Sequence, residues 1–348
     1  MFRTSANSRL INSIALITLC AGLTAAQALT PAGPKRPAGV PSDYVITPFG
    51  YYHASCVTHL AKGDEVRRNE NSIKHADGTS DSIHVCAFAH FKADGTKIMG
   101  DEQEQASNLA LSEAAKQAAS QNPKQPTISH AWVEYASTTT SSSFGELIAE
   151  WNVPPTPTAN NGQTVYLFPG MEDYADVVTI IQPVLGWNSD FASAWGIASW
   201  NCCKSGTVFE ATPTRVNPGD TILGYMFDTC ASGTLSCPTW DIVTYDLTLG
   251  RYSELLNTSS QGQTFNWAFA GALEVYNIAQ CANYPPNGSI SFYDVNLYND
   301  AFALVANPNW TVTNSSSGLT PQCSYGGSVP HQVTLSYYST RSIAPSEK

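Results

Sequence analysis

Two polar side chains interrupt two apolar stretches of the chain. Gln182 stands in the run from Val177 to Trp187, VVTIIQPVLGW, and Glu274 stands in the run from Phe269 to Ile278, FAGALEVYNI. Both runs predict buried strands, because they are apolar almost throughout and bounded by polar segments. Burying an amide or carboxyl without a partner costs roughly 1–3 kcal/mol. We therefore expect the two strands to lie side by side, with Gln182 and Glu274 facing one another across an active site.

Such a pair can hydrolyse a peptide bond, and the expected chemistry requires no metal and no cofactor. Burial raises the pKa of a carboxyl, so Glu274 would exchange a proton near mildly acidic pH. It would take a proton from the attacking water and give it to the leaving amine. The amide of Gln182 would donate to the developing oxyanion, a contact worth roughly 2.7–4 kcal/mol in other enzymes. Alternatively, the two side chains only satisfy each other or backbone groups in the core.

The motifs of other enzyme classes do not occur in the sequence. There is no Gly-x-Ser-x-Gly elbow, no His-Glu-x-x-His, no phosphate loop and no dinucleotide fingerprint. His130 and His331 stand at the two ends of the β-rich region, which disfavours a Ser-His-Asp triad. Carboxylate chemistry remains.

The order and spacing of these residues resemble the eqolisins, the family of glutamic peptidases. The two motifs that carry the resemblance are Phe168-Pro169-Gly170-Met171-Glu172 with Ile180-Ile181-Gln182, and Gly271-Ala272-Leu273-Glu274-Val275. The resemblance implies a β-sandwich of two long curved sheets, acid endopeptidase activity on polypeptides, and Gln182 with Glu274 as the catalytic pair. The chain departs from the family at four positions, where the family has Trp, Asp, Trp and Asp: Phe168, Glu172, Gly271 and Val275.

The resemblance also implies a set of residues that bind substrate or support the catalytic pair. The glycine and the acid of the first motif belong to it, and tryptophans would line the substrate cleft. In this sequence the set is Phe168, Gly170, Glu172, Trp187, Trp195 and Trp200.

Two other functions fit the same residues. A jelly-roll glycoside hydrolase needs two carboxylates ~5–9.5 Å apart, which Glu274 could form with Glu172 or Glu150, and tryptophans would stack on the sugars. A non-catalytic module that binds glycans or cell walls would keep the cleft without the chemistry. Glu172→Gln would abolish a glycosidase, whereas a peptidase depends more on Gln182.

The elements that position these residues form an all-β domain over residues 126–340. Strand patterns follow one another with turn signals between them, such as Asn161-Gly162 and Pro286-Asn287-Gly288. This predicts a concanavalin-like β-sandwich or jelly roll of two antiparallel curved sheets. The expected strands are 143–152, 164–169, 177–187, 193–200, 207–214, 220–228, 239–247, 263–278, 289–297 and 332–338, and residues 341–348 form a tail.

A small α+β unit over residues 29–125 precedes this domain. It combines strand-like pieces, one helix predicted over 101–121, and five of the seven histidines: His53, His59, His75, His84 and His90. The arrangement is typical of a propeptide, and equally of an ordinary two-domain protein. As a propeptide the unit would inhibit the enzyme by covering its cleft, and histidines that charge between pH 5 and 8 would release it.

The N-terminus and the composition predict a secreted protein. Arg3 and Arg9 flank the start of an apolar core that ends at Ala26-Gln27-Ala28, which is typical of a signal peptide over residues 1–28. There are 17 Lys and Arg against 28 Asp and Glu, which excludes a nucleic-acid partner that needs a basic face. No other stretch is long enough to cross a membrane. Nothing indicates an oligomer, so a monomer is expected.

Eight cysteines remain after removal of the signal peptide, which predicts disulfides in a secreted chain. The pairs nearest in sequence are Cys56 with Cys86 and Cys230 with Cys237. Adjacent cysteines rarely bridge each other, so Cys202 and Cys203 are expected to bond outward to Cys281 and Cys323. A disulfide is favoured over a metal site at His53, Cys56 and His59. Four glycosylation sequons are expected in surface loops: Asn257, Asn287, Asn309 and Asn314.

Overall fold

The computed structural model describes residues 33–67, 72–83, 86–98, 131–176, 179–203, 206–314, 321–330 and 332–337. The predicted signal peptide, the predicted helix over 101–121 and the predicted tail lie outside these residues, as do His84, His130 and His331. Residues Pro31–Lys348 belong to one compact unit. In the described part of that unit there is no α-helix, and no helix there could span a membrane.

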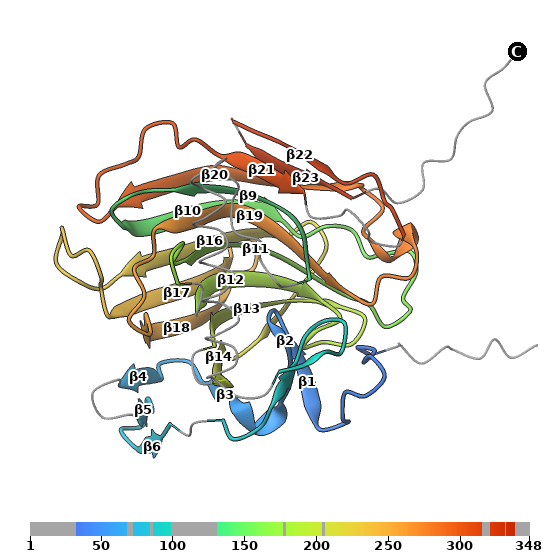
Figure 1. Cartoon of the computed structure of the whole chain (residues 1–348), viewed down its shortest axis with the longest axis horizontal. Helices are drawn as coiled ribbons and strands as arrows, with labels where there is room; N and C mark the ends of the chain where they lie inside the picture. Colours follow the sequence, from blue (N-terminus) through green and yellow to red (C-terminus); the bar gives the residue numbers. More distant parts are fainter. Residues whose placement is uncertain are drawn as a thin grey trace, which may run out of the picture. The chain divides into compact units, whose positions relative to one another are not determined.

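Two large sheets packed on each other dominate the structure (Figure 1). The ten-stranded sheet has the order β22-β23-β20-β10-β16-β17-β18-β4-β5-β6. The nine-stranded sheet has the order β21-β9-β19-β11-β12-β13-β14-β3, and β15 pairs with β13. The predicted all-β sandwich is therefore confirmed.

The strands of the sandwich follow the turn signals of the sequence. They are β9 (Trp132–Thr139), β10 (Phe144–Asn152), β11 (Thr164–Glu172), β12 (Ile180–Trp187), β13 (Trp195–Cys202), β14 (Val208–Ala211), β15 (Thr214–Val216), β16 (Thr221–Asp228), β17 (Thr239–Asp246), β18 (Arg251–Ser259), β19 (Trp267–Tyr276), β20 (Ser289–Asn299), β21 (Thr311–Asn314), β22 (Gly326–Ser328) and β23 (Val333–Ser336), with the 3-10 turn η4 (Cys281–Asn283). The expected strands match ten of these, but β9, β15, β18, β21 and β22 were not predicted.

The N-terminal unit consists of short strands. They are β1 (Tyr44–Thr47), β2 (Gly50–His53), β3 (Val57–Leu60), β4 (Glu65–Arg67), β5 (Ser72–Lys74), β6 (Ser80–Ser82), β7 (His90–Phe91) and β8 (Lys97–Ile98), with the 3-10 turn η1 (Ala54–Cys56). Four of them form a separate sheet in the order β1-β2-β7-β8. The unit lies below the nine-stranded sheet in the view of Figure 1.

The N-terminal unit is continuous with both sheets of the sandwich. β3 pairs in parallel with β14, where His59 stands opposite Glu210. β4 pairs in parallel with β18, where Glu65 stands opposite Leu256. The unit therefore covers the edge that each sheet presents at this side of the sandwich.

The buried hydrophobic residues form two clusters, one on each face of the nine-stranded sheet. The first cluster lies between the two sheets and contains Trp151, Leu167 and Ile181. The second lies between the nine-stranded sheet and the N-terminal unit, where Tyr51 and Phe49 pack on sheet residues that include Trp200. Both faces of β11 and β12 are therefore covered, which explains why these strands are continuously apolar instead of alternating.

Two of the disulfides agree with the prediction, and the other two differ from it. Cys56 is bonded to Cys86, and Cys230 to Cys237. The expectation that Cys202 and Cys203 bond outward is wrong, since these neighbours are bonded to each other. Cys281 is bonded to Cys323, with Cα atoms 5.4 Å apart, a separation that a disulfide spans.

The four sequons do not all lie in surface loops. The asparagines that are exposed are Asn287, Asn309 and Asn314. Asn257 is half-buried inside β18, where its backbone N–H donates to the carboxylate of Asp241 at 2.6 Å. The prediction of a surface loop is wrong for Asn257, because its strand lies in the middle of the sheet.

Candidate active site

Three polar side chains share the face of the nine-stranded sheet that the N-terminal unit covers. Glu172 ends β11, Gln182 lies in β12 and Glu274 lies in β19. Their neighbours at alternate positions on the same strands, such as Phe168 and Ile180, belong to the second core cluster. The three side chains are 1%, 0% and 0% exposed, so the whole group is withdrawn from water.

Glu274 is held by two hydrogen-bond donors. The indole Nε1 of Trp132 donates to Oε2 at 3.1 Å, and the hydroxyl of Tyr276 donates to Oε1 at 2.5 Å. Burial nevertheless raises the pKa of Glu274 well above its ordinary value, because desolvation of the carboxylate exceeds the effect of the two donors. The charge of Glu172 raises it further. Glu274 is thus an oriented carboxyl that keeps its proton at acidic pH.

Gln182 and Glu172 lie next to each other on neighbouring strands. Glu172 pairs with Ile180, which is two residues from Gln182, so the two side chains are diagonal neighbours on one face. Both amide atoms of Gln182 and Oε2 of Glu172 have no hydrogen-bond partner among the described residues. Burial, together with the nearby charge of Asp173, raises the pKa of Glu172 to about 8. Within the described part of the chain, these three atoms therefore have unused hydrogen-bonding capacity.

The prediction that the strands of Gln182 and Glu274 lie side by side is wrong, because β11 runs between them. Glu274 pairs with Tyr166 of β11, whereas Ile181, beside Gln182, pairs with Met171. The two register positions are therefore about four residues apart, or roughly 13 Å along the strand. Gln182 and Glu274 share a face, but they do not form a hydrogen-bonded pair in this form of the protein.

The residues expected around the pair divide between the two faces. Phe168 lies on the covered face, where its ring packs edge-on against Trp132 at 5.3 Å. Trp200 also lies there and contacts Phe49 of the N-terminal unit. The expectation that Trp187 and Trp195 line the cleft is wrong, because they pack together between the two sheets, with ring centroids 5.5 Å apart.

Two positions of the motifs, Gly170 and Gly271, leave little room for a side chain. A side chain at Gly170 would press on Ile180 and on the carbonyl of Ile181, at 3.2 and 3.3 Å. A Cβ at Gly271 would overlap the ring of Phe292 from the other sheet. The large aromatic residue that the family has at this position does not fit in this chain, since the opposing sheet is too close.

Sequence reasoning missed two further buried carboxyls, although the signal for both was present. Glu210 lies in the apolar run TVFEA and Glu134 in AWVEYA, each a lone acid in a strand, like Glu274. They are 2% and 0% exposed. Burial raises the pKa of Glu210 well above its ordinary value and that of Glu134 to about 8. Glu134 pairs with Leu273 and lies by the backbone amides of Gly326 and Ser336, at the C-terminal strands.

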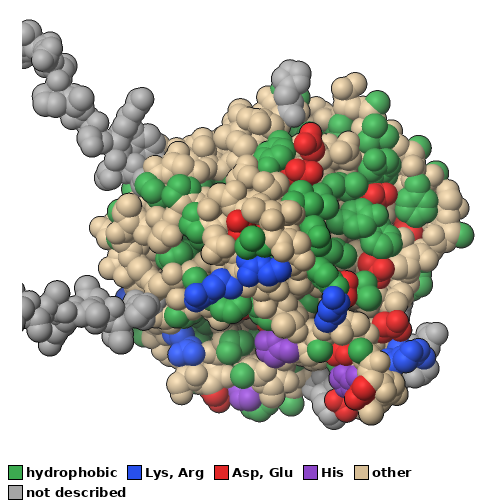
Figure 2. Space-filling view, turned by 180° about the vertical axis from the view of Figure 1, so that it is seen from behind, with side chains coloured by type: hydrophobic (Ala, Val, Ile, Leu, Met, Phe, Trp, Pro, Cys, Tyr) green, Lys and Arg blue, Asp and Glu red, His purple; other side chains and the backbone are tan. Residues whose placement is uncertain are grey.

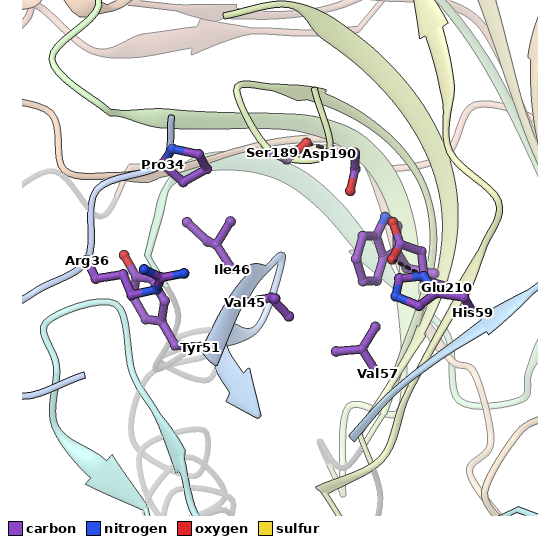
Figure 3. Close-up of a pocket in the computed structure, with 11 residues that line it drawn as sticks. Pro34, Arg36, Val45, Ile46, Tyr51, Val57, His59, Ser189, Asp190 and Glu210 are labelled. Atoms are coloured by element: carbon purple, nitrogen blue, oxygen red, sulfur yellow. Dashed lines mark hydrogen bonds and ion pairs between the residues drawn. The ribbon is translucent and has the colours of Figure 1, made fainter. Parts of the chain in front are cut away.

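A pocket of about 220 Å³ opens between the N-terminal unit and the edge of the covered face (Figure 3). Its charged lining comes from Arg36, His59, Asp190 and Glu210, and Trp200 forms part of the sheet side. His59 Nδ1 lies 2.9 Å from Glu210 Oε2. Figure 3 shows Asp190 directed from its loop toward the side of the pocket that holds Glu210.

In the described part of the chain, one group of potential metal ligands lies close together, and it contains a disulfide. Asp228, Cys230 and Cys237 lie close together, but the two sulfurs form a disulfide with each other. The sulfur of Cys56 is bonded to Cys86. Its neighbour His53 lies against Asp43, with Nε2 3.3 Å from the carboxylate.

Comparisons with known proteins find similar chains among solved structures alone. No protein-family model and no curated protein matches the chain. Among solved structures, scytalido-glutamic peptidase with a peptide-based transition-state analogue aligns at 16% identity and a TM-score of 0.44, over 59% of this chain and 98% of that chain. SCP-B, a member of the eqolisin family of peptidases in complex with the tripeptide Ala-Ile-His, aligns at 16% identity and 0.42, over the same shares. Aspergilloglutamic peptidase from Aspergillus niger aligns at 13% identity and 0.32, over 50% and 98%. The chain is thus similar, at low identity, to solved eqolisins.

Proposed function

We propose that the protein is a secreted acid endopeptidase whose active site is the group of Gln182, Glu172 and Glu274. The observation that carries the proposal is the unpartnered, fully buried amide of Gln182 on a face that also holds two carboxyls with raised pKa values. Leaving an amide unbonded costs roughly 1–3 kcal/mol, so the site carries a penalty that a substrate or a bound water would relieve.

In this mechanism Glu274 exchanges the proton and Gln182 stabilises the oxyanion. Glu274 keeps its proton in the covered form, and it ionises once the N-terminal unit has left and water reaches the carboxyl, because desolvation no longer raises its pKa. The carboxylate then accepts a proton from the water that attacks the scissile carbonyl, and donates it to the leaving amine. Trp132 and Tyr276 hold the carboxyl in place and favour its ionised form once the water attacks. The amide of Gln182 donates to the oxygen of the tetrahedral intermediate. Because Gln182 and Glu274 lie about four register positions apart on strands separated by β11, this mechanism requires their side chains to approach each other after the N-terminal unit has left. Glu172, the diagonal neighbour of Gln182, holds the water or the amide.

The N-terminal unit has to move before a polypeptide reaches these groups. Tyr51, Tyr52 and Phe49 of this unit pack on the same face, and the described form leaves the three site residues unexposed. We therefore propose that the unit inhibits the enzyme and leaves at acidic pH or after cleavage. Residues 1–28 would direct the chain out of the cell.

The test is hydrolysis of unfolded casein by the full-length protein between pH 2 and pH 7. Glu274→Gln should lower the rate about 10²–10⁴-fold, because it removes the general base. Glu134→Gln is the matched control, since it changes a buried carboxyl on the neighbouring strand without touching the site, and it should retain the rate. No cleavage at any pH, with the N-terminal unit removed, would contradict the proposal.

The same variants separate the alternative functions. A glycosidase would need Glu172 as the second carboxyl, because Glu150 lies in β10 of the other sheet. In that case Glu172→Gln would abolish glycan hydrolysis, and Gln182→Ala would not. A binding module would turn over neither class of substrate.

A further inference from the structure

The outward face of the ten-stranded sheet carries aromatic rings and carboxyls side by side. Its strands β16 and β17 alternate regularly between buried and half-exposed residues, so every second side chain points away from the sandwich. Figure 2, which views the molecule from behind, shows hydrophobic side chains (green) and acidic ones (red) lying together over a broad area. The core between the two sheets separates this face from the candidate active site.

Neighbouring strands place the acids and the aromatic residues next to each other. Glu146 of β10 stands opposite Phe227 of β16 on one side and Tyr298 of β20 on the other. Glu150, four residues along β10, stands opposite Tyr293 of β20. Residues directly opposite each other on one face have their Cβ atoms about 5 Å apart. Each of the two carboxyls therefore lies beside an aromatic ring.

The rings are held by one another and by hydrogen bonds. Tyr225 stacks on Phe227 with centroids 4.7 Å apart, and Tyr245 of β17 stacks on Tyr252 of β18 at 6.0 Å. The hydroxyl of Tyr225 donates to Glu146. The face thus presents ordered aromatic side chains, whose bodies are apolar and whose hydroxyl tips are polar.

The charge of this face is negative. The strands β20, β10, β16 and β17, which are neighbours in the sheet, contain no lysine and no arginine. They place Glu146, Glu150 and Asp241 at half-exposed positions, and β18 adds Glu254 opposite Val243. A positively charged partner is therefore complementary to the face.

One ammonium group already lies on this surface. Nζ of Lys62 stands 4.4 Å from the centroid of the Tyr252 ring, and the charge of Glu254 acts on it as well. An ammonium gains from the face of an aromatic ring and from a nearby carboxylate at the same time. Lys62 thus shows which chemical group the combination of ring and carboxyl binds.

The position of the face in the sheet favours a polysaccharide over a polypeptide. The strands β10, β16 and β17 are paired on both sides, so an extended peptide cannot add to them as a further strand. A sugar polymer needs no free edge, because its rings have apolar faces that pack on aromatic side chains and polar rims that hydrogen-bond. Repeated pairs of ring and carboxyl match a polymer whose sugar units carry amino groups.

We propose that the outward face of β20, β10, β16, β17 and β18 binds a polysaccharide that carries amino groups. The aromatic rings pack on the sugars, and the carboxylates bind the ammonium groups. The inference does not rest on the proposed peptidase function, since this face belongs to the other sheet. Binding here would hold the protein on such a polymer while the candidate active site faces away from it.

The experiment is isothermal titration calorimetry of the full-length protein with the hexamer of glucosamine at low salt. Burial raises the pKa of Glu146 and of Glu150, so the pH is set at 6.5, about two units above the ordinary value of a Glu. The hexamer of N-acetylglucosamine provides the sugars without the charge, and hexalysine provides the charge without the sugars. The glucosamine hexamer should bind at least about tenfold more tightly than either, and added salt should weaken it.

Charge and ring are tested by separate variants. Glu146→Gln combined with Glu150→Gln keeps the shape of both side chains and removes two charges, so it should weaken binding about tenfold. Asp43→Asn combined with Asp190→Asn is the matched control, because it changes the net charge equally at exposed positions outside the ten-stranded sheet, and it should keep the wild-type affinity. Tyr245→Thr removes one ring, keeps a residue that favours strands and should weaken binding several-fold.

Each other outcome overturns a stated part of the proposal. Equal affinity for the two sugar hexamers would remove the role of the amino groups, and tighter binding of hexalysine would replace the polysaccharide by a basic polypeptide. No binding of the glucosamine hexamer, or an equal loss in the double variant and its control, would overturn the site itself. Glu274→Gln should bind the hexamer like the wild type, so a failure of the proposed peptidase function leaves this inference standing.

Discussion

The two faces of the nine-stranded sheet are both buried, but they are built differently. The face toward the other sheet is apolar along β11 and β12, with Leu167, Ile181 and Leu185 in one continuous cluster. The opposite face of the same strands carries Glu172 and Gln182 among its aromatic residues. Because successive residues of a strand point to opposite sides, a shift of one position separates the structural core from the candidate site.

Glu134 and Glu274 show what this difference means for two residues of the same type. They lie on the paired strands β9 and β19, and both have raised pKa values. Glu134 lies by the backbone of β22 and β23, which belong to the sandwich itself. Glu274 is held by Trp132 and Tyr276 on the face that the N-terminal unit covers. The two carboxyls therefore differ in what covers them: strands of the sandwich cover Glu134, and the N-terminal unit covers the face that carries Glu274.

The sharpest contrast should come from two tryptophans of β13. Trp195→Ala should lower the free energy of unfolding by about 3–5 kcal/mol, because it leaves a cavity between the sheets. Trp200→Ala should instead loosen the N-terminal unit, since it removes the ring that Phe49 contacts. Urea unfolding measures the first effect, and limited proteolysis of residues 33–98 measures the second. If Trp200→Ala lowers the free energy of unfolding as much as Trp195→Ala does, and the N-terminal unit is not cleaved earlier, the two faces contribute to stability in the same way.

Gln182→Leu tests whether the polar face is retained for chemistry. It should lower hydrolysis about 10²–10³-fold, because the oxyanion donor is lost. It should also raise the free energy of unfolding by about 1–3 kcal/mol, because an unpartnered buried amide is replaced by an apolar side chain. Kinetics on casein and urea unfolding measure the two effects. A variant that is less stable than the wild type would place Gln182 in the structural core instead.

The sequence predicted ten of the fifteen strands described for the sandwich, because these runs had turn signals at their ends. It also singled out Gln182 and Glu274, since a polar residue in an apolar strand is visible in the sequence. Which strands are neighbours is not visible, and β11 lies between the two because it pairs with both β12 and β19. Trp187 and Trp195 were assigned to the wrong face for a related reason. A strand buried on both sides has no polar alternation to tell its faces apart.

The strand β18 was not predicted, because polar or charged residues stand on both of its faces, among them Arg251, Ser253 and Glu254, so its sequence shows no clear apolar alternation. The disulfide between Cys202 and Cys203 was not predicted, because adjacent cysteines rarely bridge each other. Glu210 had the same signal as Glu274, a lone acid in an apolar run, but the sequence could not show which strand would stand opposite it. The strand opposite Glu210 is β3, which contains His59 and lies about 150 residues earlier in the sequence.

Glu134 should make stability depend on pH. Its pKa is about 8 in the folded protein against 4.5 for the ordinary value. Between these values the unfolded chain has released the proton and the folded chain still holds it. The contribution to stability is therefore complete below pH 4.5 and is lost as pH rises toward 8, at about 1.4 kcal/mol per pH unit. Glu134→Gln should remove about this slope from urea unfolding measured at pH 5, 6 and 7, and an unchanged slope would show that Glu134 ionises in the folded state.

The smallest effect concerns the hydroxyl of Tyr51, which forms one hydrogen bond within the N-terminal unit and one to the sandwich. The hydroxyl of Tyr51 accepts a hydrogen bond from Asn277 Nδ2 at 3.1 Å and donates to the carbonyl of Lys35 at 3.2 Å. Tyr51→Phe keeps the ring that packs on Tyr276, with centroids 5.9 Å apart, and removes only these two bonds. Each is worth about 0.5–1.5 kcal/mol.

Hydrogen exchange of the backbone amides reads out this local effect. Amides of β1 and β2 should exchange several-fold faster in Tyr51→Phe, whereas amides of β16 and β17, in the other sheet, should keep the wild-type rate. Faster exchange in both regions would mean that the N-terminal unit unfolds only together with the sandwich. The covered face would then be a second core, and the difference between the two faces would lose its functional meaning. Faster exchange confined to β1 and β2 would identify the N-terminal unit as the part that opens first, directly over Glu274 and Gln182.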